Sequence, residues 1–315
     1  MSIIKEQLEY TLDKFELDKE IGEYYRGKVR DNYYFDDTML MITTDRVSAF
    51  DHVLGTIPFK GQILTEIAKF WFDKTRNIVP NHIISKPDPQ VLISKKAKPL
   101  PIEIIIRQYI TGSLWREYSQ GINNQYGFML PDNLQKNQKL SKPIITPSTK
   151  AEYGQHDEPI SKEKIINDLV PPHIYAKAEE YSLQLFQAGQ DWANERGLIL
   201  VDTKYEFGMY NDELIVIDEI HTPDSSRYWI KDTYENNFKN NHHQDMLDKE
   251  NIRQWLIDKG FKGEGVPPEL TDDIRILLSE KYIELYKKLI GKDFIPSIGD
   301  VKNRIINNLN EKSII

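Results

Sequence analysis

The sequence has no cysteine and no long hydrophobic run. Without cysteine, a disulfide framework, a thiolate metal site and a cysteine nucleophile are all excluded. None of the hydrophobic segments approaches the roughly 20 apolar residues that span a membrane, and residues 1–6 do not begin the apolar core of a secretory signal. These absences predict a protein of the cytoplasm that has no membrane partner.

Positive charge is in the minority, because 41 Lys and Arg residues stand against 49 Asp and Glu, which gives a net charge of −8. That balance argues against a general nucleic-acid or anionic-membrane surface. An acidic protein binds phosphate only where it concentrates a few donors locally. The sequence also lacks a Walker A loop and a G-x-G-x-x-G motif, so a nucleotide site would need another arrangement.

The first third of the chain predicts an antiparallel meander. Two strands flank a glycine turn over residues 23–35, and a third strand runs from Thr38 to Thr44. A short amphipathic helix follows over 64–72. The Pro- and Lys-rich stretch 86–101 is interpreted as a crossing between subdomains, so we divide the chain into an antiparallel-sheet subdomain, 1–100, and a second subdomain, 101–315.

The second part of the chain mixes strands and helices. The predicted elements are a strand over 102–106 ending at Arg107, a helix over 114–118, mostly loop over 120–160, a long helix from Pro172 to Gly197, a hairpin with arms 198–207 and 213–220, and a tail helix with Thr271 as N-cap. The buried face predicted for that tail helix is Ile274, Leu277, Leu278, Tyr282, Leu285, Tyr286 and Leu289.

A glycine turn flanked by cations is the first candidate site. Gly27 lets the backbone approach a ligand closely, and Lys28 and Arg30 lie one strand period apart on the same face. This arrangement suits a triphosphate. An ordinary hairpin turn with solvated cations is equally compatible with these residues.

Paired carboxylates on the hairpin form the second candidate site. Lys204 and Glu206 share one strand face with Asp202, and a register centred near Asp212 would set Glu206 opposite Asp218. Two carboxylates about 4 Å apart repel by roughly 4 kcal/mol at an effective dielectric of about 20, so they need a cation between them. Mg²⁺ fits, with Lys204 on a phosphate oxygen, although an exposed charged hairpin remains the alternative.

The third candidate site is a pocket for a phosphate monoester. Ser113 opens a predicted helix, whose free N–H groups favour an anion, and Arg107 and Arg227 supply bidentate donors. Ser113 could instead be a simple N-cap.

The fourth candidate site is the polar loop 147–157, which contains Lys150, His156 and Asp157. Such a loop could recognise a zwitterionic amino acid or could simply be solvated.

Six motifs in this order resemble the SAICAR synthetase family. They read RGKVRDNY, TTDRVSAFD, RQYITGSLWREY, TPSTKAEYGQHDEPIS, LVDTKYEFG and VIDEIHTPDSSRYW. The match runs from about Tyr24 to Trp229, and the tail after Asp232 resembles the long form found in yeast-like enzymes.

The resemblance implies an α+β fold with an ATP cleft between two subdomains, similar to nucleotide sites of ATP-grasp proteins and protein kinases. It implies that ATP, the carboxyaminoimidazole ribotide CAIR and L-aspartate give SAICAR, ADP and phosphate, with Mg²⁺ as cofactor, in a monomer. By motif position, the resemblance assigns Gly27, Lys28 and Arg30 to the ATP phosphates, Glu103 to the nucleotide, and Glu206 and Asp218 to Mg²⁺. It places Lys204 between ATP and the ribotide carboxylate, and it assigns Arg107, Ser113 and Arg227 to the ribotide phosphate. Lys150, His156 and Asp157 are assigned to the ribotide and aspartate sites.

Two other functions share parts of this pattern. An ATP-dependent small-molecule kinase would use the same glycine turn and paired acids, and would form ADP without aspartate. A non-catalytic nucleotide-binding module would bind ATP without turnover.

Overall fold

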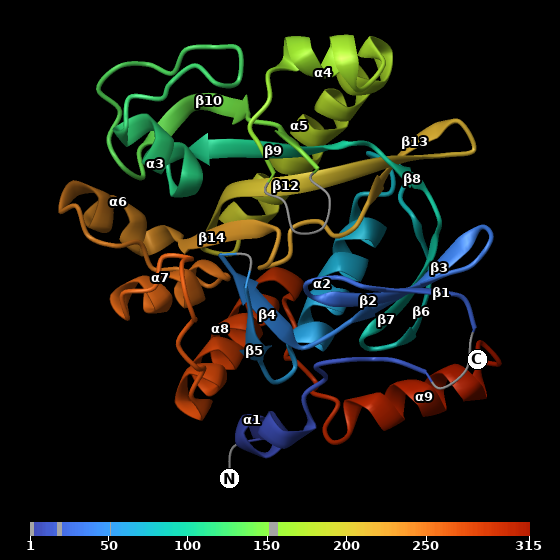
Figure 1. The fold of residues 1–315 in the computed structure, drawn as a ribbon. Helices are drawn as coiled ribbons and strands as arrows, with labels where there is room; N and C mark the ends of the chain where they lie inside the picture. Colours follow the sequence, from blue (N-terminus) through green and yellow to red (C-terminus); the bar gives the residue numbers. More distant parts are fainter. Residues whose placement is uncertain (1–2, 18–20, 51, 151–156) are drawn as a thin grey trace.

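The computed structural model describes residues 3–17, 21–50, 52–150 and 157–315. Helices and sheets are mixed along the chain, which confirms the α+β class. Two sheets lie one above the other in Figure 1, with helix α5 behind the upper sheet and α2 between the two. In the described ranges, no helix is both long and apolar enough to cross a membrane.

A five-stranded antiparallel sheet contains the predicted meander. Its order is β1-β2-β3-β7-β6, and the strands are β1 Glu23–Arg26, β2 Arg30–Tyr34, β3 Thr38–Thr43, β6 Ile83–Asp88 and β7 Val91–Lys95. The interpretation of 86–95 as a crossing is therefore wrong. Val91 and Leu92 are buried in this sheet, and Pro87 is tolerated because the β6–β7 register shifts between Ser85 and Asp88.

A seven-stranded sheet forms the other half of the structure. Its strands are β8 Lys98–Pro99, β9 Ile102–Tyr109, β10 Lys139–Ile145, β11 Ser148–Thr149, β12 Leu198–Tyr210, β13 Glu213–Ile217 and β14 Ser226–Ile230. A separate pair consists of β4 Arg46–Ala49 and β5 His52–Thr56. Two predictions are corrected, since β10 and β11 lie in the stretch expected to be loop, and β9 continues past Arg107.

The β12–β13 hairpin has a two-residue turn. Asn211 and Asp212 both have positive φ angles, 49° and 61°, as such a turn requires. Tyr210 therefore pairs with Glu213, and Glu206 pairs with Ile217. The predicted pairing of Glu206 with Asp218 is wrong by one residue, because a two-residue turn places the centre between Asn211 and Asp212.

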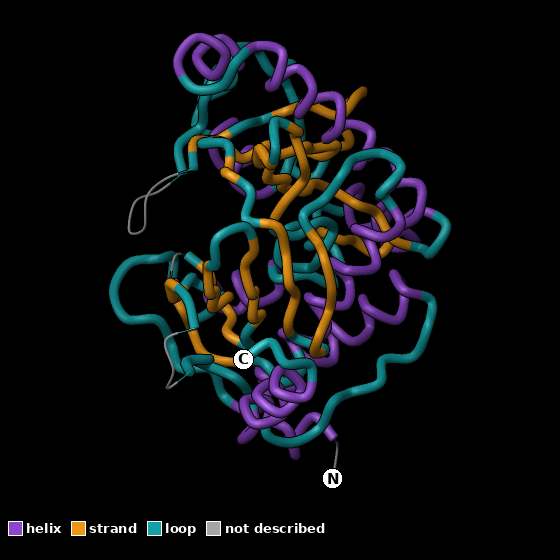
Figure 2. Tube along the Cα trace, turned by 90° about the vertical axis from the view of Figure 1, so that its right-hand side faces the viewer, coloured by secondary structure: helices purple, strands orange, loops and turns teal. Residues whose placement is uncertain are grey.

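The longer helices cover the sheets and join them, as the tube in Figure 2 shows from the side. The helical segments are α1 Ile3–Glu6, the 3-10 helix η1 Gln7–Tyr10, α2 Lys60–Lys74, α3 Gly112–Ser119, α4 Lys162–Asp168, α5 Pro172–Asn194, α6 Lys231–Lys239, α7 Glu250–Asp258, α8 Asp272–Ile290 and α9 Val301–Glu311. The main core lies where α2 and α5 pack against β9, β12 and α8.

The tail folds back onto the start of the chain. Helix α8 packs against α2, and α9 buries Val301, Ile305 and Leu309 against Leu40 and Ile42 of the five-stranded sheet. Most of the buried face predicted for α8 is confirmed; the structure corrects Leu277, which is 48% exposed. Because the last helix packs on the first sheet, the division of the chain at residue 100 stays a prediction.

Candidate active site

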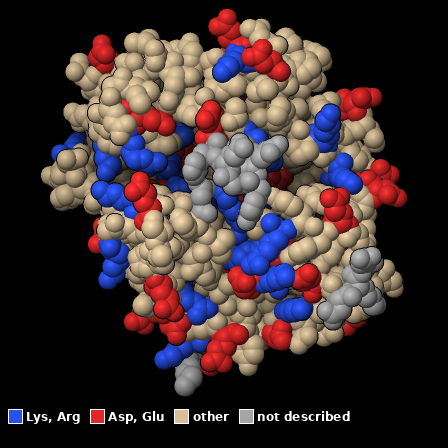
Figure 3. All heavy atoms as spheres, in the orientation of Figure 1, with Lys and Arg blue, Asp and Glu red and all other residues tan. Residues whose placement is uncertain are grey.

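A cleft of about 1190 Å³ lies between the two sheets. Lys and Arg side chains gather around the middle of this face of the molecule (Figure 3). Predicted site residues from five separate stretches line the cleft: Gly27, Lys28, Arg30, Glu103, Arg107, Ser113, Lys150, Asp157, Lys204, Glu206 and Asp218. Arg227 lines an adjoining pocket of about 250 Å³, and His156 lies outside the described residues.

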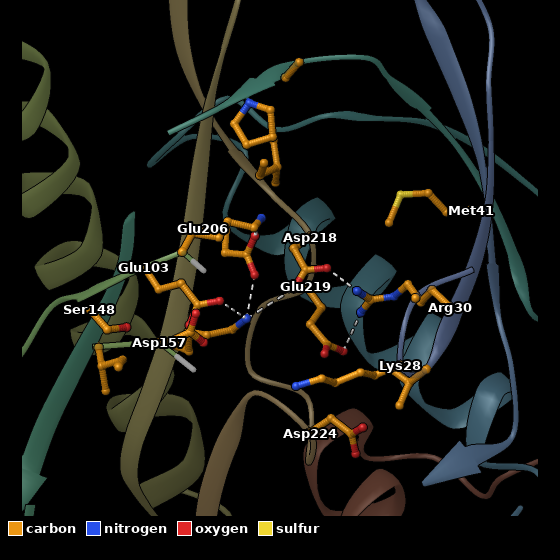
Figure 4. A pocket seen from close by; sticks show the side chains of 18 of the residues that line it. Lys28, Arg30, Met41, Glu103, Ser148, Asp157, Glu206, Asp218, Glu219 and Asp224 are labelled. Carbon is orange, nitrogen blue, oxygen red and sulfur yellow. Dashed lines mark hydrogen bonds and ion pairs between the residues drawn. The ribbon is translucent and has the colours of Figure 1, made fainter. Parts of the chain in front are cut away.

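Lys204 is the centre of a network of acids. Its Nζ lies 2.9 Å from Glu103 Oε1, 2.5 Å from Glu206 Oε1 and 3.8 Å from Asp218 Oδ2 (Figure 4). Lys150 from the polar loop contacts the other oxygen of Glu206. Strands β9 and β12 and the end of β13 thus bring the predicted lysine and both predicted metal acids together.

Burial and charge act in opposite directions on this network. Burial would raise the pKa of Glu206, but Lys204 and Lys150 outweigh it and hold that pKa well below its usual range. Burial raises the pKa of Glu103 to about 7. The charge of Lys204 opposes this rise, and the charge of Asp157 adds to it. Glu206 is therefore an anion at neutral pH, whereas Glu103 titrates near neutrality.

Arg30 faces the acids of the hairpin. It forms ion pairs with Asp218 and with Glu219, the latter at 2.9 Å. Burial would lower the pKa of Arg30, but Asp218 and Glu219 outweigh it and raise that pKa above its usual value. Burial raises the pKa of Asp218 to about 6 against the opposing charge of Arg30. Glu219, which the sequence interpretation gave no role, reaches the cleft because Asp218 has a φ of 66° and turns the chain.

The predicted glycine turn joins β1 and β2, but Lys28 lies in the turn itself and so does not share a strand face with Arg30 as predicted. The N–H of Gly27 donates to the carbonyl of Arg30 at 2.8 Å, which closes the turn between β1 and β2. Lys28 points from this turn into the cleft (Figure 4). The turn and the hairpin acids therefore lie on opposite walls of one cleft.

The donor set of the cleft fits Mg²⁺ that arrives with a nucleotide. Among the described residues, no group of three or more His, Asp or Glu side chains could hold a metal ion by itself. Mg²⁺ usually takes only one or two protein carboxylates and completes its shell with water and phosphate oxygens. Glu206 and Asp218 supply two such carboxylates, both within 4 Å of Lys204.

The adjoining pocket brings the three predicted monoester ligands together. Arg107 Nη1 donates to Asp202 Oδ2 at 3.1 Å, and Arg227 donates to the same oxygen. Arg107 Nη2 also donates to Ser113 Oγ at 3.1 Å. Asp202, noted on the β12 face but given no role, therefore holds both guanidinium groups.

The helix start at this pocket differs from the simple N-cap alternative. The N-cap of α3 is Thr111, so Ser113 lies inside the first turn. A Cβ added to Gly112, whose φ is 58°, would lie only 2.4 Å from a guanidinium nitrogen of Arg227. Glycine is therefore required where the helix start meets the arginine.

Charged residues from the tail complete the pocket and were not found from the sequence. Glu250 of α7 accepts from Arg227 Nε at 3.2 Å and from Arg253 at 3.0 Å. Lys249 and Arg253 line both the cleft and the adjoining pocket. Their only sequence signal was a charged first helical turn, which does not distinguish a binding site from a solvated surface.

These features define an α+β protein in which one cleft gathers lysines, arginines and carboxylates from both sheets. The sequence model of the SAICAR synthetase family matches residues 23–269, and the chain belongs to that family. This finding confirms the resemblance of the six motifs.

Relatives match along nearly the whole chain. A phosphoribosylaminoimidazole-succinocarboxamide synthase of Cytophaga hutchinsonii is 48% identical, covering 94% of this chain and 96% of its own. One from Bacteroides fragilis is 46% identical, covering 90% and 93%. Among solved structures, the SAICAR synthase of Saccharomyces cerevisiae complexed with SAICAR has a TM-score of 0.79 and 36% identity, covering 90% of this chain and 99% of its own. A SAICAR synthetase in complex with ADP has a TM-score of 0.66 and 26% identity, covering 87% and 100%.

Proposed function

We propose that this enzyme joins L-aspartate to CAIR with ATP, giving SAICAR, ADP and phosphate through an acyl phosphate. The observation that carries the proposal is the junction at Lys204. The ammonium of Lys204 pairs with the hairpin acid Glu206. Asp202, two residues earlier on the same strand, pairs with the two arginines of the adjoining pocket. The solved relatives bind SAICAR in one case and ADP in another, which supports a site for both kinds of ligand.

The chemistry explains why so many charged groups converge. A carboxylate resists attack by an amine until one of its oxygens becomes part of a leaving group. An oxygen of the CAIR carboxylate attacks the γ-phosphorus of ATP, and the bond from that phosphorus to the ADP oxygen breaks. The aspartate amine then attacks the carboxyl carbon, the bond to the phosphate oxygen breaks, and the amine loses a proton. Catalysis of this kind depends on orientation and charge neutralisation.

The cleft residues have separable roles in this proposal. Gly27 and Lys28 border the ATP phosphates, and Arg30 links that wall to the acids through Asp218 and Glu219. Glu206 and Asp218 would hold Mg²⁺, which neutralises charge on the nucleotide phosphates when bound. Burial would lower the pKa of Lys204, but Glu206 and Glu103 outweigh it and raise that pKa well above its usual value. Lys204 therefore stays charged, and it contacts the oxygens of the phosphoryl group during transfer.

The ribotide and aspartate occupy the side of the cleft nearer β9. Arg107, Ser113 and Arg227 bind the ribotide phosphate, since two guanidinium groups on one carboxylate leave further donors for an anion. Lys150 and Asp157 border the ribotide and aspartate, and Glu103 lies between this group and the nucleotide. The role predicted for His156 beside these substrates stays a proposal, because this residue lies outside the described residues.

The test combines substrate omission with isotope labelling. ADP release is measured with CAIR, aspartate and ATP each omitted in turn, and full turnover is expected only with all three. With both carboxylate oxygens of CAIR labelled, one label should appear in inorganic phosphate and the other in the new amide. Unlabelled phosphate alongside SAICAR would exclude the acyl phosphate. Sustained ADP formation that does not depend on aspartate would point to a kinase, label in AMP would indicate an adenylate, and ATP binding without turnover would indicate a binding module.

A further inference from the structure

Lys249 lies where the cleft and the adjoining pocket meet. It is the N-cap residue of α7, it lines both cavities, and its side chain is 19% exposed. Lys204 also lines both cavities, from β12. Two lysines from distant parts of the chain therefore border the passage between the hairpin acids and the paired arginines.

Asp224 connects the Lys249 ammonium to two buried side chains. Lys249 Nζ lies 3.9 Å from Asp224 Oδ2, and the same oxygen accepts from Lys60 Nζ at 2.8 Å. The other oxygen, Oδ1, accepts from the Tyr282 hydroxyl at 2.9 Å. Lys60 is completely buried, and Tyr282 is nearly so. Helices α2 and α8 thus fix the Asp224 carboxylate from one side and leave Lys249 on the cavity side.

In this network one carboxylate, Asp224, faces two lysine ammonium groups. Burial would raise the pKa of Asp224, but Lys60 and Lys249 together outweigh it and lower that pKa to about 2. Lys249 therefore shares its nearest carboxylate with Lys60, and burial lowers the pKa of Lys249 to about 8. The other charges that face it are Glu219 and Arg253, and Glu250 accepts from Arg253 and Arg227 together. A cation at a cavity wall that shares its carboxylate with a second lysine suits an anionic ligand group, since a buried charge that is only partly compensated is costly.

We propose that Lys249 binds a substrate carboxylate at this passage, with Asp224, Lys60 and Tyr282 as the positioning residues that hold its ammonium in place. The inference rests on the proposed function, in which both CAIR and aspartate carry a carboxylate. A purely structural role would require only the Lys60–Asp224 pair, which already joins α2 to the turn before β14. Lys249 is not needed for that connection between α2 and the turn.

The experiment measures kcat and the KM of all three substrates in four variants. Lys249→Met removes the charge and keeps most of the length, and it is expected to raise the KM of CAIR or aspartate about tenfold or more, as loss of a charge-assisted contact does. The substrate affected identifies the carboxylate. The KM of ATP should stay within about twofold. Lys249→Arg should recover part of the loss, because the cation is restored.

Tyr282→Phe tests the positioning network and has a matched control. It removes one hydroxyl from Asp224 and is expected to raise the KM of the same substrate about threefold. Tyr286→Phe removes a similar hydrogen bond one turn further along α8, to Glu66 of α2 at 2.8 Å. Neither Tyr282 nor Tyr286 lines the cleft or the adjoining pocket. The control should lower the melting temperature as much as Tyr282→Phe and leave every KM unchanged.

The outcomes separate this inference from the proposed function. Wild-type kinetics in Lys249→Met, a change confined to the KM of ATP, or equal kinetics in Tyr282→Phe and Tyr286→Phe would overturn the inference while the enzyme still makes SAICAR. Absence of SAICAR formation by the wild-type protein would overturn the proposed function itself.

Discussion

At the scale of single residues, the site works by mutual neutralisation of buried charges. Lys204 and Lys150 share Glu206, Arg30 spans Asp218 and Glu219, and both arginines of the adjoining pocket share Asp202. Such groups keep their charge in a buried setting only because each has an opposite partner within hydrogen-bond distance. Removing one member therefore changes the charge state of its neighbours as well.

Glu206→Gln and Asp218→Asn should each lower kcat by about 100-fold or more, because each removes one of two anionic ligands proposed for Mg²⁺. Circular dichroism should show an intact fold, and excess Mg²⁺ should partly restore the activity of Asp218→Asn. The matched control is Glu213→Gln, an exposed residue on β13 of the same hairpin. Wild-type kcat in either cleft variant would remove the paired acids from the mechanism.

Arg107→Ala and Lys28→Ala should have opposite effects on the two polyanionic substrates. Loss of Arg107 should raise the KM of CAIR by about tenfold or more and change that of ATP little, since bidentate charge-assisted contacts are among the stronger polar interactions. Loss of Lys28 should do the reverse, because Lys28 lies on the wall of the glycine turn. Equal effects on both KM values in both variants would mean that the two anion sites are wrongly assigned.

At the scale of elements, strand β12 organises both the site and the core. Asp202, Lys204 and Glu206 alternate with Tyr205 and other buried residues, so one strand face carries the chemistry and the other packs inward. The Tyr205 hydroxyl bonds His221 Nε2 at 2.5 Å, and the His221 ring packs edge-on against Trp71 with centroids 4.4 Å apart. The hairpin is thereby anchored to helix α2.

The contribution of two buried histidines, His221 and His82, to the free energy of unfolding should fall as the pH is lowered below about 6.5. Burial lowers the pKa of His221 and of His82 to about 3 each. Between pH 6.5 and 3 the unfolded chain binds protons that the native state does not, so this stability is complete above 6.5 and is lost as the pH falls. Each histidine adds a slope of at most about 1.4 kcal/mol per pH unit.

Urea unfolding of wild type and His221→Gln at pH 7.5 and pH 5 measures this slope. The variant should be less stable at pH 7.5, because it lacks the ring that packs on Trp71, and its stability should depend less on pH. An identical slope in both proteins would show that His221 does not take up a proton on unfolding.

At the scale of the whole molecule, the tail closes the structure on itself. Helix α8 buries Leu278, Leu285 and Leu289 in the main core, and α9 covers the five-stranded sheet. Arg304 of α9 also donates from Nε to Asp88 of β6 at 3.1 Å. Helices α8 and α9 therefore bury their apolar faces within the chain.

We expect the protein to be a monomer, because α8 and α9 pack their apolar residues against the rest of the chain. Light scattering at working concentration should give the chain mass of 37.0 kDa. Twice that mass would contradict the expectation, and deletion of α9 in such a dimer would show whether the tail forms the interface.

The sequence by itself determined the local structure around the site and the family. Alternating polarity predicts β12 and the β1–β2 meander, and spacing of two along a strand places Lys204 and Glu206 on one face, since both depend only on neighbouring residues. The six motifs, read in order, identify the family because together they specify many residues of one cleft.

Only the tertiary structure decided which charges meet. The one-residue difference in hairpin register arose from the positive φ angles of Asn211 and Asp212, and the turn at Asp218 brought Glu219 to Arg30. Lys249 and Tyr282 reach Asp224 from segments with no motif. Such contacts join residues far apart in the chain, and their distances are set by how helices and sheets pack, which local periodicity does not encode.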